Sequence, residues 1–281
     1  MADATAVLRV AHLYPGHMNL YGDRGNVLCL EARARWRGIA VTVDSVDIDD
    51  RFDPEGYDIV FVGGGPDREQ QRIARDLTGP KAGPIRRAVE GGVVFLAVCG
   101  GYQLFGHYYR LAEGEDLPGL GIFDMGTEHP GIEARRCIGN LAARCNVPLR
   151  GSPLPEAVPE ALEGLEGNAS STSSPARRET LVGFENHGGR TYLAPGCTPL
   201  AQVIAGSGNN GADGTEGAVY KNAFGTYLHG SFLPKNPRFA DHLVALALER
   251  QGVEAGLPPL DDRVEERAHR AAMALATRLR T

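Results

Sequence analysis

Short apolar runs alternate with segments of helical periodicity through the first third of the chain. A strand is expected where a brief apolar or alternating run is bounded by turn residues, and a helix where apolar residues recur every three or four positions. These criteria predict strands over 7–14, 39–46, 57–62 and 93–98, and helices over 27–36, 68–77 and 84–90. Asp23 or Asn26 is expected to cap the first helix. Because strands that alternate with helices pair in parallel, the pattern predicts an α/β fold with a doubly wound, mostly parallel sheet flanked by helices.

The rest of the chain is less regular. The pattern of apolar residues there predicts one or two strands over 138–149, a strand and turn over 181–190, and a hairpin from 218–220 and 223–228. It also predicts helices over 239–250 and 263–279. Residues 150–180 are rich in Gly, Pro, Ser and Glu, which is typical of a flexible surface insertion and not of a second domain. We therefore expect residues 1–281 to form one domain.

The composition of the chain excludes several classes of protein. The chain has 281 residues, a net charge of −6 and 42% hydrophobic residues. These are values of an ordinary soluble globular protein, without the basic surface that nucleic-acid binding requires. No apolar stretch approaches the roughly 20 residues of a membrane span, and the N-terminus has no signal-peptide pattern. Five scattered cysteines do not indicate a disulfide framework, so we expect a reducing, cytoplasmic location.

The apolar run over 93–98 ends directly at Cys99, which two glycines follow. A buried strand and a helix joined by a tight, glycine-rich turn form a nucleophile elbow, which lifts the side chain at the turn above the edge of the sheet. The N-terminus of the following helix favours the thiolate through its dipole and free N–H groups. The pattern therefore indicates a nucleophilic Cys99 and not a buried structural cysteine.

A second glycine-rich turn, over residues 63–65, follows the strand over 57–62 and falls at the same edge of the predicted sheet. It lacks the Gly-Lys-Ser/Thr ending of a phosphate loop and the glycine spacing of a dinucleotide site. The functional alternative to a plain turn is an oxyanion hole. There, glycine N–H groups of this turn, together with that of Gly100, face the oxygen that becomes charged in acyl transfer.

A cysteine nucleophile needs a base or a cationic partner. His229 is favoured among the eight histidines because a predicted strand ends on it and a glycine follows it, and His187, also among glycines, is the second candidate. A carboxylate that orients the imidazole often lies two residues beyond the histidine, where this chain has Ser231. Three alternatives therefore remain open. The orienting acid is another residue of this chain, it comes from a partner chain, or the site works without an acid. No cluster shows metal-ligand spacing.

Five sequence blocks together carry a resemblance to a known family. They are 19–26 (NLYGDRGN), 63–70 (GGGPDREQ), 99–103 (CGGYQ), 183–191 (GFENHGGRT) and 225–230 (GTYLHG). With them the chain resembles class I glutamine amidotransferases of the cobyric-acid-synthase type, and within these the GatD family, the glutaminase subunits of lipid II isoglutaminyl synthase. The resemblance covers nearly the whole chain.

The resemblance implies that glutamine is hydrolysed to glutamate and ammonia, with Cys99 as nucleophile and His229 as general base. It implies oxyanion donors and glutamine-binding residues at Gly64 or Gly65, Gly100, Gln103, Asn186, His187 and Arg136, with Arg135 as the alternative to Arg136. It also implies a Mur-ligase-like partner, MurT, which uses ATP and Mg and the released ammonia to amidate the D-glutamate α-carboxyl of lipid II. The third triad acid would come from that partner, and this chain would hold no cofactor.

Three alternatives compete with this reading. A cobyrinate-type amidotransferase would share the chemistry, although such enzymes usually carry an N-terminal P-loop domain and this sequence starts directly at the amidotransferase pattern. A catalytically silent regulatory subunit has no need of Cys99, His229 and the glycine turn together. A cysteine hydrolase that acts on peptides is the third alternative.

Overall fold

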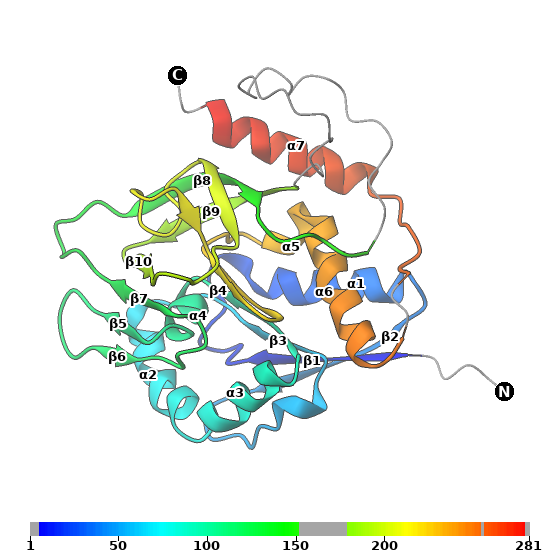
Figure 1. Cartoon of the computed structure of the whole chain (residues 1–281), viewed down its shortest axis with the longest axis horizontal. Coiled ribbons are helices and arrows are strands. Elements are labelled where there is room, and N and C mark those ends of the chain that lie inside the picture. Colours follow the sequence, from blue (N-terminus) through cyan, green and yellow to red (C-terminus); the bar gives the residue numbers. More distant parts are fainter. Residues whose placement is uncertain (1–5, 152–178, 254–255, 279–281) are drawn as a thin grey trace.

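The central sheet of the computed structural model has six strands in the order β13-β14-β4-β3-β1-β2 (Figure 1). The structure describes residues 6–151, 179–253 and 256–278. In chain order, the strands of this sheet are β1 (Val7–Leu13), β2 (Ala40–Val46), β3 (Ile59–Val62), β4 (Val94–Val98), β13 (Ala218–Tyr220) and β14 (Ala223–Thr226). Neighbouring strands are parallel except in the predicted hairpin of β13 and β14. The prediction of an α/β fold with a mostly parallel sheet is confirmed.

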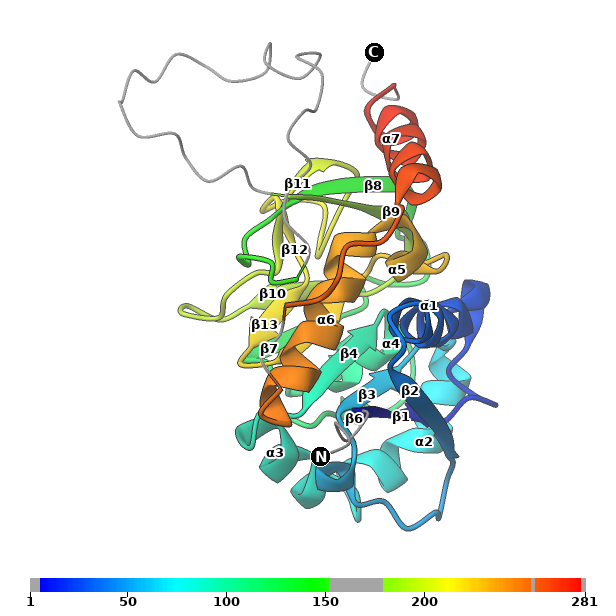
Figure 2. The same cartoon turned by 90° about the vertical axis from the view of Figure 1, so that its right-hand side faces the viewer.

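Helices cover both faces of this sheet. In both views α1, α5 and α6 lie on one face, and α2 and α3 lie on the other (Figures 1 and 2). The helices are α1 (Arg24–Arg35), α2 (Asp67–Thr78), α3 (Ala82–Glu90), α4 (Gly100–Leu104), α5 (Phe232–Lys235), α6 (Pro237–Arg250) and α7 (Arg263–Arg278), with single turns η1 (Leu20–Gly22) and η2 (Pro54–Gly56). Every predicted helix is present, because each has an apolar face that the sheet or a neighbouring helix buries.

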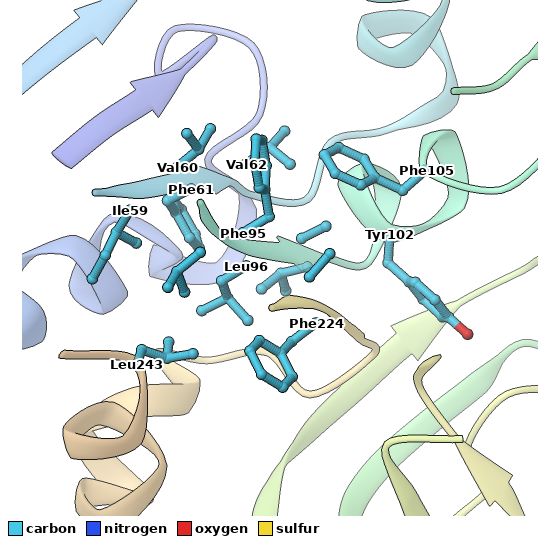
Figure 3. Packing of buried hydrophobic residues seen from close by; sticks show 14 of the residues in the cluster. Ile59, Val60, Phe61, Val62, Phe95, Leu96, Tyr102, Phe105, Phe224 and Leu243 are labelled. Atoms are coloured by element: carbon cyan, nitrogen blue, oxygen red, sulfur yellow. The ribbon is translucent and has the colours of Figure 1, made fainter. Parts of the chain in front are cut away.

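The main core lies between β3, β4 and the covering helices (Figure 3). All residues of β3 and β4 are buried, as expected for interior strands of a parallel sheet, which have continuous apolar runs. Phe224 of β14 and Leu243 of α6 pack on the same cluster. By contrast, β2 is an edge strand and is largely exposed, which explains its alternating sequence.

Two further sheets were not predicted. One has the order β10-β7-β5-β6 and the other the order β12-β11-β8-β9. Their strands are β5 (Tyr108–Arg110), β6 (Leu117–Pro118), β7 (Met125–Glu128), β8 (Cys137–Cys145), β9 (Thr180–His187), β10 (Arg190–Leu193), β11 (Ala201–Ala205) and β12 (Thr215–Glu216). Most of these strands are too short for a periodic apolar signal. β8 is the single strand in the region where one or two were predicted, and α7 packs against β8 and β9 (Figure 2). Most of the predicted insertion, residues 152–178, lies outside the described residues.

Candidate active site

The carboxyl ends of four neighbouring parallel strands, β1, β3, β4 and β14, meet at one edge of the central sheet. Ligands of doubly wound sheets bind outside this edge. The segments that follow these strands contain η1, the glycine turn over residues 63–65, Cys99 and His229. Topology therefore brings together four parts of the site that are far apart in the sequence.

Cys99 occupies the turn between β4 and α4 with φ 49° and ψ −105°. This backbone conformation costs a non-glycine residue about 1–3 kcal/mol. The two glycines after Cys99 let the glycine turn approach closely: a Cβ on Gly100 would lie 2.9 Å from the Gly65 carbonyl oxygen, and one on Gly101 would lie 2.9 Å from that of Gly63. The strand–turn–helix geometry predicted for the elbow is confirmed, with a helix of only five residues.

Gly64 lies next to both Cys99, the predicted nucleophile, and His229, the predicted base. A Cβ added to Gly64 would lie 2.7 Å from His229 Cε1 and 3.2 Å from Cys99 Cβ. Any side chain at this position would therefore enter the space between the two catalytic candidates. The prediction that the glycine turn and Cys99 face one another is confirmed.

His229 is fully buried and is fixed by its own backbone, whose N–H donates to the Phe184 carbonyl oxygen at 2.7 Å. The ring of Tyr21 lies edge-on against the imidazole, with 5.2 Å between the ring centroids. Burial lowers the pKa of His229, but the negative charges of Cys99 and Asp23 raise it more, and the resulting pKa is about 10. The imidazole is therefore a cation at neutral pH, which is the state that pairs with a thiolate.

Asp23 brings a carboxylate to this histidine from within the chain. It is fully buried, and its Oδ2 lies 3.4 Å from His229 Nδ1 and accepts the Gly64 N–H at 2.7 Å. Of the predicted oxyanion donors, Gly64 thus has its N–H directed to Asp23, whereas Gly65 and Gly100 flank the elbow.

Asp23 occupies the N-cap position of the first helix, as one of the two predicted alternatives, but it does not cap the helix with its side chain. The helix begins at Arg24, the Asp23 side chain makes no capping bond, and Asn19 Oδ1 accepts the Arg24 N–H at 2.7 Å instead. Aspartate just before a helical pattern is usually a cap, so sequence reasoning assigned it there. The available signal for a functional role was its position after β1, at the carboxyl edge of the sheet.

Ser231, at the position where an orienting acid often lies, faces away from His229. Its Oγ donates to the Gly22 carbonyl oxygen at 2.9 Å. A Cβ on Gly25 would lie only 2.2 Å from this Oγ, so the space around Ser231 is filled. The structure therefore has a carboxylate next to His229, but it comes from the loop after β1.

The predicted glutamine-binding residues fall into two groups, of which one lies at the exposed side of the site. Arg136 Nε donates to Asn186 Oδ1 at 3.1 Å, and Asn186 Nδ2 donates to the Tyr21 hydroxyl at 2.5 Å. This series of contacts reaches Tyr21, which covers His229. The Arg136 side chain lies at the site through its contact with Asn186. The Arg135 carbonyl oxygen instead accepts a hydrogen bond from the Arg190 side chain.

The other group, Gln103 and His187, is buried beneath the site around Tyr227. Gln103 Nε2 donates to the Tyr227 hydroxyl at 3.2 Å and its Oε1 accepts from Gln70 Nε2 at 3.0 Å. The ring of His187 stacks on that of Tyr227, with 3.6 Å between centroids, and its Nδ1 donates to the Gly189 carbonyl oxygen at 2.8 Å. Sequence reasoning missed Tyr21, Gln70 and Tyr227, because nothing in their local sequence shows that they converge here.

The described residues contain neither a metal-binding cluster nor a membrane-spanning helix. Among them, no three His, Cys, Asp or Glu side chains are grouped so as to hold a metal ion. None of the helices in this part of the chain is both long and apolar enough to cross a membrane.

Solved structures with the same fold are glutamine amidotransferase domains of class I. The structure of PurLQS from Thermotoga maritima matches with a TM-score of 0.51 at 16% identity, covering 95% of this chain and 99% of the other. The glutaminase domain of Trypanosoma brucei CTPS with bound acivicin matches with a TM-score of 0.51 at 12% identity, covering 89% and 96%. The fold is thus that of class I amidotransferases, as predicted.

The chain belongs to the family of CobB/CobQ-like glutamine amidotransferase domains, whose profile matches residues 9–237. The lipid II isoglutaminyl synthase (glutamine-hydrolyzing) subunit GatD of Streptococcus pneumoniae is 40% identical over 91% of this chain and 86% of its own length. The GatD subunit of Staphylococcus aureus is 36% identical over 96% and 97%. The cobyric acid synthase of Pelotomaculum thermopropionicum is 30% identical over 71% of this chain and 34% of its own length. The predicted resemblance to this family and to GatD subunits is confirmed.

Proposed function

We propose that this protein is the glutamine-hydrolysing subunit of a lipid II isoglutaminyl synthase. The observation that carries the proposal is the identity of 36–40% to two GatD subunits over more than nine-tenths of the chain. The geometry around Gly64 supports it, because a strained Cys99 and a cationic His229 meet there. Strain of this kind is retained where it serves a reaction.

In the proposed reaction, Cys99 Sγ attacks the side-chain amide carbon of glutamine and forms a C–S bond. The carbonyl oxygen becomes an oxyanion, which the N–H groups of Gly65 and Gly100 stabilise. The Gly64 N–H, a further predicted donor, is already bound to Asp23 Oδ2. The His229 imidazolium gives its proton to the departing amine, and ammonia leaves a thioester on Cys99. His229 then takes a proton from water, which hydrolyses the thioester to glutamate and regenerates the thiolate.

We assign substrate binding to Arg136 and Asn186, which lie at the exposed side of the site and contact each other. A guanidinium can bind the α-carboxylate of glutamine in a bidentate manner. Gln103 and His187 support the site from below, since both are buried in the network around Tyr227. Arg135 is the weaker candidate for glutamine binding.

The partner in this proposal is a MurT-like Mur ligase, which binds ATP and Mg and uses the ammonia to amidate the D-glutamate α-carboxyl of lipid II. The relatives are themselves named as subunits, which supports a complex. We place the reaction in the cytoplasm, in agreement with the five cysteines, all within the described residues, none of which forms a disulfide. A cobyric-acid-type role is less well supported, since the similarity is lower and covers less of the chain. A silent regulatory subunit would not require the strained Cys99.

The first test measures ammonia release from glutamine by the protein alone and with its Mur-ligase partner. Cys99→Ser is expected to abolish hydrolysis, because it removes the thiolate that forms the thioester. His229→Ala is expected to lower kcat by roughly 10²–10⁴-fold, the usual contribution of a general acid and base. Cys197→Ser, which alters a half-buried cysteine outside the site, is the matched control and should retain full activity. Undiminished release by Cys99→Ser would contradict the mechanism.

A further inference from the structure

A cleft outside the candidate active site lies between α1 and the edge strand β2. These two elements lie side by side in both views (Figures 1 and 2). The cleft has a volume of about 430 Å³, which falls in the range of small-molecule sites. Its lining comes from the first two turns of α1, from β2, from the end of β1 and from the loop after β1. Neither Cys99 nor His229 lines it, so the proposed glutamine reaction does not account for it.

His12 of β1 lines the inner side of this cleft. It is 4% exposed, and its Nε2 has no hydrogen-bond partner among the described residues. Burial and the charge of Arg24 lower the pKa of His12 to about 4, against an opposing effect of Asp23. The ring is therefore neutral at neutral pH and has one N–H group to donate. Because a buried polar atom is costly to leave without a partner, His12 is suited to bind a molecule that enters the cleft.

The other polar groups of the lining are mostly hydrogen-bond donors. Arg24, at the exposed start of α1, makes no side-chain ion pair or hydrogen bond within the described part of the chain. Asn19 accepts the Arg24 backbone N–H with its Oδ1, which leaves the amide nitrogen to donate, and Ser45 adds a hydroxyl group. The carboxylate of the lining, Glu31, is paired with Arg35 at 2.7 Å. A free guanidinium at the N-terminus of a helix favours an anion.

The remaining lining residues are apolar. Leu28 of α1 and Val43 of β2 are 49% and 36% exposed, and they offer contact surface to the carbon skeleton of a ligand from two walls of the cleft. A metal ion is not indicated, because no three His, Cys, Asp or Glu side chains of the described residues are grouped to hold one. The lining thus combines one free cation, neutral donors and apolar walls.

We propose that the cleft between α1 and β2 binds a small organic anion, in which a carboxylate or phosphate group is attached to an apolar body. Arg24 pairs with the anionic oxygens, and His12 donates a hydrogen bond from the inner side. Leu28 and Val43 contact the apolar body. This site is independent of the proposed glutaminase function, because its lining does not include the predicted catalytic residues.

Binding is measured on the full chain labelled with ¹⁵N-histidine, with phenyl phosphate and benzoate as the anionic probes. Benzyl alcohol and benzylamine have a similar apolar body without the negative charge and serve as controls. We expect both anions to shift the ring-nitrogen signals of His12 saturably, and the two controls to leave them unchanged. Titration calorimetry gives the affinities, which show whether phosphate or carboxylate fits better. Inorganic phosphate, which lacks an apolar body, should bind more weakly than phenyl phosphate.

Two variants test the residues assigned to the anion. Arg24→Gln removes a charge at an exposed position and is expected to weaken binding of both anions roughly 10–100-fold, the usual contribution of a hydrogen bond to a charged group. Arg87→Gln is the matched control, since Arg87 is an exposed arginine of α3, on the other face of the sheet. His12→Phe keeps an aromatic ring, should also weaken binding, and assigns the His12 signals. If His12→Phe does not fold, calorimetry on the two arginine variants decides the question.

The outcomes separate this inference from the proposed function. No saturable binding of either anion, or equal affinities of wild type and Arg24→Gln, would overturn the proposal. Equal binding of benzyl alcohol would do the same, because the charge would then contribute nothing. The measurements require neither glutamine nor the partner ligase. A chain that binds the anions but releases no ammonia with its partner would contradict the proposed function alone, and an active glutaminase that binds no anion would contradict the cleft alone.

Discussion

Glu216 shows at the scale of one residue how a buried carboxyl group responds to pH. It is fully buried, and desolvation raises its pKa from the ordinary value of 4.5 to about 7, although hydrogen bonds from Thr226 and Tyr227 oppose the rise. The folded state therefore holds this proton more tightly than the unfolded state. Stability is expected to fall by about 3 kcal/mol as the pH rises from below 5 to above 7. In Glu216→Gln this part of the pH dependence should be absent.

Urea unfolding at pH 5 and pH 8 measures this effect as the difference between two free energies. Glu133→Gln, at an exposed position, is the control and should keep the wild-type difference. If Glu216→Gln shows the same pH dependence as wild type, the Glu216 carboxyl group is not the source.

At the scale of an element, the elbow helix α4 packs on the strand and turn beside it with no space for side chains. A Cβ on Gly101 would lie 2.9 Å from the carbonyl oxygens of both Val62 and Gly63. Backbone atoms cannot move aside as a flexible side chain does, so Gly101→Ala should lower the free energy of unfolding by roughly 1–3 kcal/mol. It should also lower kcat, because α4 would be displaced together with Cys99.

Thermal unfolding and glutamine hydrolysis, measured on the same preparation, test this prediction. Gly56→Ala is the control, since no heavy atom lies within 4 Å of its added Cβ. A Gly101→Ala protein with wild-type stability and kcat would show that α4 adapts.

At the scale of the whole molecule, Arg33 joins three distant segments. From α1, its guanidinium pairs with Asp241 of α6 at 2.6 Å and with Asp262, just before α7, at 2.7 Å. Arg33 and Asp241 are buried. Without Arg33, Asp241 would still pair with Arg37 at 2.7 Å, but Asp262 would lose its contacts with Arg33. Arg33→Ala is therefore expected to lower the free energy of unfolding by about 3 kcal/mol, the lower end of the cost of breaking a buried ion pair.

Urea denaturation gives this value directly. Arg35 lies on the same helix and pairs with Glu31 at the surface, so Arg35→Ala should cost less than about 1 kcal/mol. Equal effects of the two substitutions would contradict the assignment of Arg33 as the link between the segments.

Much of the fold could be predicted because its signals are local. The buried strands β3 and β4 are continuous apolar runs, and α2, α3 and α6 have apolar faces at helical spacing. The positions of Cys99 and His229 at the carboxyl edge of the sheet were predictable for the same reason, since each follows a strand and precedes a glycine. The organisation of residues 1–281 as one domain stays a prediction.

Tertiary structure alone decided which side chains converge on the site. Asp23 is in a cap position by sequence, yet the parallel order of β1, β3 and β14 brings it to His229, more than two hundred residues further along the chain. The short strands β5 to β7 and β10 to β12 likewise depend on pairing with distant strands, which no local pattern encodes. Sequence periodicity thus determined the helices and the main strands, together with the positions of Cys99 and His229 after strands. Both kinds of feature depend on neighbouring residues in the chain. The positions of the Asp23 carboxylate, of Tyr21 over His229 and of the network around Tyr227 depend on long-range packing, which only the folded chain specifies.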